Sequence, residues 1–200
     1  MTPPHPHALL VDTASRIAEA PDAAWRDFRA AFEERRCEPG EHLVLAGDPL
    51  ADVFFVARGL LRLYYTDRDG REWNKAFTAE RGFAGSLAAG LLGVPAPYSI
   101  QALEPAVVLA APWAALEALY DAHPPLERLG RRFAERIAVK KELRERAFLE
   151  LTPTERYLAV VDDEAALAAR LPLYHVASYI GVTEVSLSRI RGRLARAAQG

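Results

Sequence analysis

The sequence has almost no cysteine, few histidines and no long apolar run. Of its 200 residues only Cys37 is a cysteine, which excludes an internal disulfide bond and a multi-cysteine iron–sulfur cluster. No segment approaches the roughly 20 apolar residues that a membrane-spanning helix requires. The first residues, MTPPHPHALLVD, have neither the basic region nor the apolar core of a signal peptide. These absences predict a soluble, cytoplasmic protein that does not bind a membrane.

The sequence also lacks the motifs of common enzymes. It has no Walker loop, no dinucleotide-binding glycine fingerprint and no nucleophile–base pair. His5 and His7 could form half of a metal site, but a site needs three or four convergent ligands, and the predicted strands contain only His42. Cys37 is a candidate thiol sensor, although a lone cysteine near a helix end is usually packed or inert. We therefore expect no enzymatic activity, no cofactor and no metal.

Apolar residues make up 50% of the chain, and the formal net charge is −2. This length and composition suffice for one or two domains with cores of their own. Acidic residues dominate the front of the chain and basic residues the back, so the small net charge hides an asymmetry.

The first 123 residues are predicted to form a tail and then a β-rich domain. Residues 1–21 are expected to be an N-terminal tail, and a helix with Trp25, Phe28 and Phe32 on one face follows. Short apolar runs then alternate with turn residues, and the Asp69–Gly70 pair between two runs is typical of a hairpin turn. Many short strands predict a jelly roll within residues 22–123.

A long helix is predicted in residues 124–151, after a short helix over residues 113–122. An apolar seam with near-heptad spacing favours a dimer helix. The alternative is a helix that packs on its own sheet, and both can hold on different faces. The predicted dimer residues are Leu126, Leu129, Phe133, Ile137, Lys140 and Leu143.

A second domain is predicted over residues 152–200. The segment Thr152-Pro153-Thr154-Glu155 is a capping box, in which the threonine caps a helix and the glutamate reaches back. Two helices are expected over residues 153–162 and 164–170, ahead of a further helical pair.

The spacing in HVASYIGVTEVSLSRIRGRL predicts a helix–turn–helix. Gly181 occupies the turn, Thr183 can cap the second helix, and Leu187 and Ile190 point inward. In such a motif the second helix reads base edges in the major groove while hydroxyls and arginines hold phosphates. An ordinary amphipathic terminal helix is the alternative. The candidate DNA-binding residues are Thr183, Glu184, Val185, Ser186, Ser188, Arg189, Arg191, Arg193, His175 and Ser178.

The segment TPTERYLAVV…LPLYHVASYIGVTEVSLSRIRGRL resembles the C-terminal region of Crp/Fnr-family transcription regulators, in the branch with ERY and ASYLGIT–LSRIR-type motifs. EPGEHLVLAGDPLADVFFVARGLLRLYYTDRDGRE is similar to the family's cyclic-nucleotide-binding-type jelly roll, including Gly40, Gly47, Gly59 and Gly70. The resemblance covers about residues 22–194. It implies an α+β homodimer joined by the long helix, with winged helix–turn–helix domains on a two-fold symmetric operator. Because the chain stops at Gly200, we expect a short or absent wing.

Two departures from the family bear on specificity and regulation. Where the family commonly has glutamate and threonine, this chain has Val185 and Ser186, although Arg189 matches a retained arginine. Valine can pack on a thymine methyl but cannot accept a hydrogen bond from cytosine, so we expect a different operator.

The second departure concerns the effector. In the family's cyclic-nucleotide-binding members a glutamate binds the ribose and an arginine binds the cyclic phosphate. These two positions fall on Ser86 and near Ala96, and no lysine or arginine occurs between Gly82 and Glu104. A buried phosphate without a cationic partner is costly, so we expect no response to cyclic AMP. The candidate effector pocket comprises Phe83, Gly85, Ser86, Leu87, Tyr98 and Ser99.

The preferred interpretation is therefore a DNA-binding regulator whose partners are duplex DNA and a second copy of itself. RNA polymerase would be a further partner of an activator, and the small-molecule effector is not identified by the sequence. Two alternatives remain open: a ligand-sensing jelly roll with weak or vestigial DNA binding, and a cupin-like metal enzyme.

Overall fold

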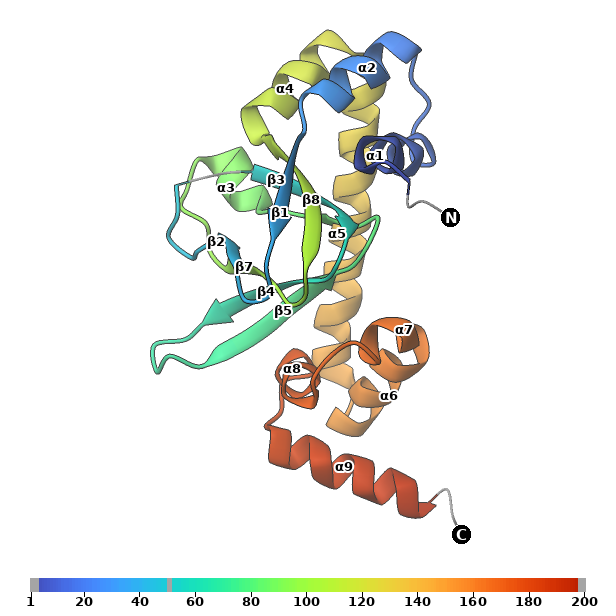
Figure 1. Ribbon diagram of the computed structural model, residues 1–200. Coiled ribbons are helices and arrows are strands. Elements are labelled where there is room, and N and C mark those ends of the chain that lie inside the picture. Colours follow the sequence, from blue (N-terminus) through green and yellow to red (C-terminus); the bar gives the residue numbers. More distant parts are fainter. Residues whose placement is uncertain (1–3, 50–51, 198–200) are drawn as a thin grey trace. The chain divides into compact units, whose positions relative to one another are not determined.

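The computed structural model describes residues 4–49 and 52–197 (Figure 1). The chain forms two compact units. The N-terminal unit runs to Tyr65 and continues over Ala76–Ile137, and the C-terminal unit comprises Thr66–Lys75 and the chain from Ala138 onward. Among the described residues, no helix has the length and apolar character needed to cross a membrane.

The N-terminal unit is built on two four-stranded sheets, as expected for a jelly-roll-like domain. The strand orders are β1-β8-β3-β6 and β2-β7-β4-β5. Neighbouring strands in the first sheet are antiparallel, as are β2, β7 and β4 in the second. The strands are β1 Glu33–Cys37, β2 His42–Val44, β3 Asp52–Arg58, β4 Leu61–Thr66, β5 Glu72–Thr78, β6 Phe83–Ala84, β7 Ser99–Ala102 and β8 Ala106–Pro112.

Strand β3 shows why this unit has two cores. Side chains alternate between the two faces of a strand. Phe54 and Val56 point into the space between the sheets, where they join Leu61, Ile100 and other buried residues. Phe55 points to the opposite face, so the run VFFV is buried on both sides.

Helices cover the outer face of the first sheet (Figure 1). Phe55 is buried in the core between this face and the helices. Leu10, Phe28, Leu116 and Leu126 all belong to this second core. The helices that contribute them are α1 Pro6–Ser15, α2 Asp22–Ala30, α4 Trp113–Ala122 and the first part of α5 Pro124–Glu150.

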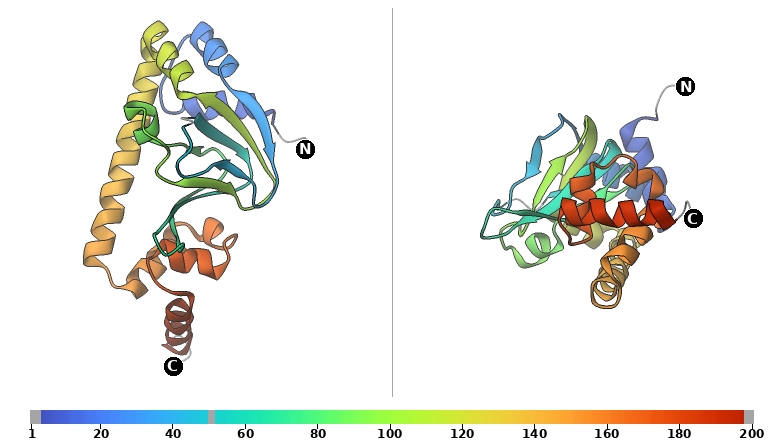
Figure 2. Two further views of the ribbon diagram at one scale, coloured as in Figure 1. Left: turned by 90° about the vertical axis from the view of Figure 1, so that its left-hand side faces the viewer. Right: turned by 90° about the horizontal axis from the view of Figure 1, so that it is seen from below.

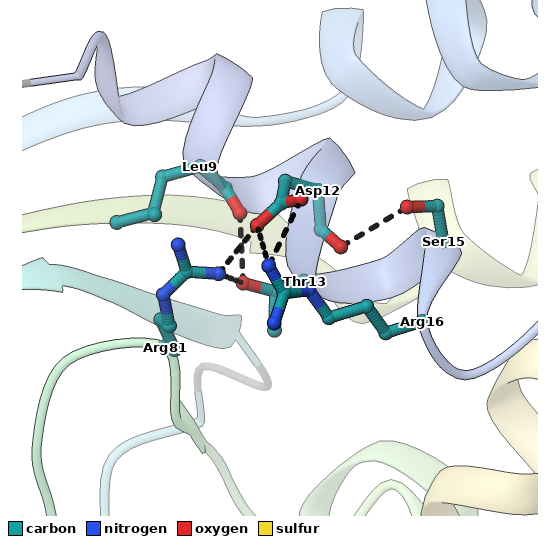
Figure 3. Close-up of polar contacts among 6 residues, drawn as sticks. All are labelled: Leu9, Asp12, Thr13, Ser15, Arg16 and Arg81. Atoms are coloured by element: carbon teal, nitrogen blue, oxygen red, sulfur yellow. Dashed lines mark hydrogen bonds and ion pairs between the residues drawn. The ribbon is translucent and has the colours of Figure 1, made fainter.

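The expectation of a tail over residues 1–21 is wrong for α1. Leu9, Leu10 and Ala14 of this helix are buried, because apolar residues at spacings of one helical turn face the sheet. Figure 3 shows the polar contacts that hold α1: Arg81 donates hydrogen bonds to the carboxylate of Asp12 and, over 3.2 Å, to the hydroxyl of Thr13. The segment is therefore part of the folded unit.

The C-terminal helices follow the sequence expectation closely. Thr152 Oγ1 accepts a hydrogen bond from Glu155 N, and Glu155 Oε2 accepts one from Thr152 N over 2.8 Å, which confirms the capping box. The turn predicted at Asp69–Gly70 is also present, with Gly70 at a positive φ of 77°. The remaining helices are α3 Leu87–Leu92, α6 Pro153–Asp163, α7 Ala165–Ala168, α8 Leu173–Tyr179 and α9 Glu184–Ala197.

Candidate nucleic-acid interface

Helices α8 and α9 are joined by a tight turn at Gly181. Its φ is +76°, and an added Cβ would lie 2.7 Å from the Phe148 ring, so only glycine fits. Thr183 then starts α9, since its hydroxyl accepts a hydrogen bond from Ser186 N over 3.2 Å. Leu187 and Ile190 of α9 are buried, as the sequence predicted.

The opposite face of α9 is exposed and carries apolar, hydroxyl and guanidinium groups. At about 100° per residue, Val185, Ser188 and Arg189 share the face that points away from Leu187 and Ile190. All three are exposed, and Val185 retains 62% of its accessible surface. Figure 2, right, looks at the chain from the side of α9, which lies in front of the other helices of its unit.

The remaining predicted DNA-binding residues of α9 flank this face. Glu184 and Arg191 lie on one side of it, and Ser186 and Arg193 on the other. Glu184, Arg191 and Arg193 are exposed, and Ser186 is half-buried beside the capping threonine, 2.9 Å from Thr183 Oγ1. The face can thus present an apolar contact, hydroxyls and several guanidinium groups to one ligand.

Two predicted DNA-binding residues are not available for this role. His175 is 3% exposed, and its Nδ1 and backbone oxygen each accept a hydrogen bond of 3.1 Å from Asn74 Nδ2. Ser178 Oγ accepts from Asn74 N over 2.8 Å and donates to Glu72 O over 3.0 Å. The prediction that His175 and Ser178 bind DNA is wrong, because both residues instead bind Asn74, and Ser178 also binds Glu72, at the hairpin tip of their own unit.

The far end of α8 is held by two arginines. Arg144 donates to Tyr179 O over 2.9 Å, and Arg156 donates to Ile180 O over 3.0 Å. Both guanidinium carbons lie 4.8 Å from the centroid of the Phe148 ring. Cations are favourable at a helix C-terminus and on aromatic faces, so this cluster fixes the end of α8. Nothing in the helix–turn–helix pattern points to Arg144 and Phe148, which come from α5.

Residues of the predicted dimer seam serve different purposes along α5. Leu126 and Leu129 are buried in the core of their own unit, and Phe133 packs on Phe83 with ring centroids 5.0 Å apart. For Leu126 and Leu129 the dimer expectation is wrong, because the same unit already buries them, whereas Phe133 is only half-buried.

Further along α5, the residues of the predicted seam are half-buried or exposed. Ile137 is half-buried, and Lys140 forms an ion pair of 3.6 Å with Glu164. Leu143 is 57% exposed, and Val139, one turn before it, is 55% exposed. This part of α5 leaves an apolar surface.

The candidate effector residues are occupied by contacts within the N-terminal unit. Phe83 lies in the helix-side core with Phe55, whereas Tyr98 lies in the core between the sheets, so the two do not line one pocket. Tyr98 donates to Gly85 O over 2.6 Å. Including Phe83 in the pocket was wrong, because β6 places residues 83 and 84 on opposite faces.

The serines of that region are engaged as well. Ser86 Oγ accepts from Ala89 N over 3.2 Å and so caps α3, directly ahead of the half-buried Leu87. Ser99 Oγ accepts from Ala46 N over 3.0 Å. Ala96 is 3% exposed and belongs to the inter-sheet core.

The other candidate sites have structural roles. His7 Nε2 lies 2.9 Å from Phe32 O, and His5 accepts a hydrogen bond at the start of α1. In residues 4–49 and 52–197 no three His, Cys, Asp or Glu side chains gather as a metal site would require. Cys37 ends strand β1 instead of lying near a helix end, and burial raises the pKa of its thiol, which disfavours the reactive thiolate.

We compared the chain with protein-family models, curated sequences and solved structures. The family model of the cyclic nucleotide-binding domain matches residues 34–123. A search of curated protein sequences found no match.

Three similar solved structures cover most of the chain. The c-di-GMP responsive global regulator CLP of Xanthomonas campestris has a TM-score of 0.73 at 15% identity, covering 89% of this chain and 93% of that one. FixK2 of Bradyrhizobium japonicum has a TM-score of 0.72 at 18% identity, with 84% and 86% covered. The catabolite activator protein of Thermus thermophilus has a TM-score of 0.54 at 20% identity, with 86% and 84% covered. At such identities the likeness concerns the fold.

Burial of Lys75 in the C-terminal unit predicts a pH-dependent stability. Burial, together with the nearby positive charges of Lys141, Arg144 and Lys140, lowers the pKa of this ammonium to about 8. Between pH 8 and the ordinary lysine value the unfolded chain binds this proton more tightly than the folded chain. The free energy of unfolding should therefore rise with pH across that window.

Replacing Lys75→Met should remove this rise and stabilise the protein at pH 7 by about 2 kcal/mol. Urea denaturation at several pH values from 7 to 10.5 measures both effects. Arg128→Met is the control, because Arg128 is an exposed cation that is not among the charges lowering the pKa of Lys75, and its loss should leave the rise in place. Parallel pH profiles for the wild type and Lys75→Met would contradict the prediction.

Proposed function

We propose that this protein is a homodimeric transcription regulator of the Crp/Fnr type, which binds a two-fold symmetric operator in duplex DNA. Helices α8 and α9 would form its helix–turn–helix, with α9 in the major groove. The observation that carries the proposal is the exposed face of α9, where Val185, Ser188 and Arg189 stand opposite buried Leu187 and Ile190.

Roles follow from the position of each side chain on α9. Arg189 lies on the outward face, where an arginine can donate two hydrogen bonds to a guanine edge. Val185 precedes it by one turn and can pack on a thymine methyl. Arg191 and Arg193 lie on the flanks, where guanidinium groups meet the phosphates that line the groove. The likeness in fold to CLP and the catabolite activator protein supports the same assignment.

Dimerisation is assigned to the second half of α5. Val139 and Leu143 are one turn apart, apolar and exposed, which is the pattern of a helix face that packs on a second helix. Since Leu126 and Leu129 are buried within their own unit, the proposed contact is shorter than the sequence suggested. A two-fold dimer would place two α9 helices on neighbouring half-sites.

Regulation by cyclic AMP is not part of the proposal. The hydroxyl of Ser86 accepts a hydrogen bond from Ala89 N and caps α3. Ala96 is a buried alanine at the position where a cation would be needed to bind the phosphate. No lysine or arginine occurs between Gly82 and Glu104. A cyclic phosphate buried there would lose the charge-assisted hydrogen bonds that normally compensate its desolvation.

Arginine substitutions test the DNA-binding assignment. The preferred operator, selected from random duplexes, should be an inverted repeat with half-site centres about 10 base pairs apart. Arg189→Ala should weaken binding to it by about 1 to 3 kcal/mol and relax the sequence preference. Arg193→Ala should weaken all duplexes alike and reduce the salt dependence. If Arg189→Ala costs specific and non-specific binding equally, Arg189 contacts a phosphate instead.

Substitutions that introduce charged residues on the exposed surface of α5 test the dimer assignment. Sedimentation should find the wild type dimeric at micromolar concentration, and Val139→Glu combined with Leu143→Glu should yield folded monomers with at least about tenfold weaker operator binding. Leu45→Glu, which charges an exposed leucine in the N-terminal unit, should leave the dimer intact. A monomeric wild type, or a dimeric double variant, would refute the assignment.

Nucleotide titration tests the effector assignment. Calorimetry with cyclic AMP and cyclic GMP should detect no binding up to about 1 mM, and neither nucleotide should change operator affinity. Micromolar affinity of the wild type for either nucleotide would overturn this part of the proposal.

A further inference from the structure

Three helices of the described chain contain a glycine in their interior, and in two of them packing requires it. A Cβ on Gly90 of α3 would enter the indole of Trp113, with Cε3 only 2.6 Å away. A Cβ on Gly130 of α5 would lie 2.8 Å from the Tyr120 ring. Both distances are shorter than any carbon–carbon contact allows, so the fold accounts for these two glycines.

Gly192 in the middle of α9 has no such explanation. An added Cβ would meet only Arg196 Nη1, at an ordinary van der Waals distance of 3.6 Å. The residue is helical and its φ is not in the left-handed region. Glycine inside a helix is less favourable than alanine, so this position lowers the stability of α9 without a benefit inside the chain.

The position of Gly192 on α9 indicates a role for the absence of a side chain there. Residues three and four apart share a helix face, which puts Gly192 in line with Ser188, with Val185 and with Arg196. This is the outward face, opposite the buried Leu187 and Ile190. The bare backbone at Gly192 therefore lies on the surface that the proposed function turns toward DNA.

We propose that Gly192 is the point where the backbone of α9 approaches the operator most closely, which makes it a specificity-determining residue. Because Gly192 has no Cβ, the second half of α9 can approach the base edges in the major groove more closely, and hydrogen bonds to those edges can form. Arg189, three residues before, and Arg196, four residues after, stand on either side of the gap. A methyl group there would hold the helix off the duplex and lengthen the contacts of Arg189.

The inference rests on the proposed function, and it makes a distinctive prediction: one substitution should stabilise the protein and weaken its specific binding. Gly192→Ala should raise the Tm by a few degrees and raise the Kd for the selected operator by about tenfold. Affinity for a random duplex should change by less than about twofold, because that mode depends on long, adaptable cationic side chains. Gly192→Leu should raise the Tm as well and weaken operator binding further.

Fluorescence anisotropy with operator and random duplexes, together with thermal unfolding, measures all of these quantities. Gly130→Ala is the control for the packing argument and should lower the Tm, since Tyr120 occupies the space. Unchanged operator affinity of Gly192→Ala, an equal loss on both duplexes, or a lowered Tm would each overturn the inference. A wild type without salt-dependent affinity for any duplex would refute the proposed function instead.

Discussion

The clamp of two arginines on the end of helix α8 is the interaction on which the C-terminal unit depends. Helix α8 has only seven residues, too few to be stable without partners. The carbonyls of Tyr179 and Ile180 at its end accept hydrogen bonds from Arg144 and Arg156, and both guanidinium groups lie against the Phe148 ring. The turn at Gly181 requires glycine, because a side chain there would collide with the Phe148 ring. The direction in which α9 leaves the turn, and hence the face it presents, is set by this cluster.

Local patterns in the sequence predicted the elements whose causes are local. The capping box at Thr152, the turn at Gly70 and the inward residues Leu187 and Ile190 depend on spacings of two to four residues, and all three are present. Strand β1 has no such local signal, because its sequence EERRC is exposed over four of its five residues and shows no apolar alternation. Helix α1 was missed because its short length and flanking prolines resemble a tail.

Errors in the candidate sites came from contacts between distant parts of the chain. His175 and Ser178 have the residue types and the spacing of phosphate ligands, but Asn74, about a hundred positions earlier, binds both. Leu129 continues the apolar seam of a dimer helix, yet the sheet of its own unit covers it. Phe83 and Tyr98 are both aromatic and near one loop, but strand pairing sends them into separate cores. Periodicity identifies which residues are buried; it does not identify what buries them.

The hairpin tip Thr66–Lys75 makes the C-terminal unit discontinuous in sequence. A segment from Ala138 onward, taken alone, would leave His175 and Ser178 without Asn74 and remove one of the two carbonyls that Arg144 binds. The unit is therefore not a transferable module. Exchanging its helices with those of a relative would require the matching hairpin tip to be exchanged too, because the two segments must vary together for α8 to remain anchored. During synthesis, moreover, the hairpin tip leaves the ribosome long before helices α6 to α9. The C-terminal unit can therefore form only after the last helices have been made, although its first segment is made much earlier.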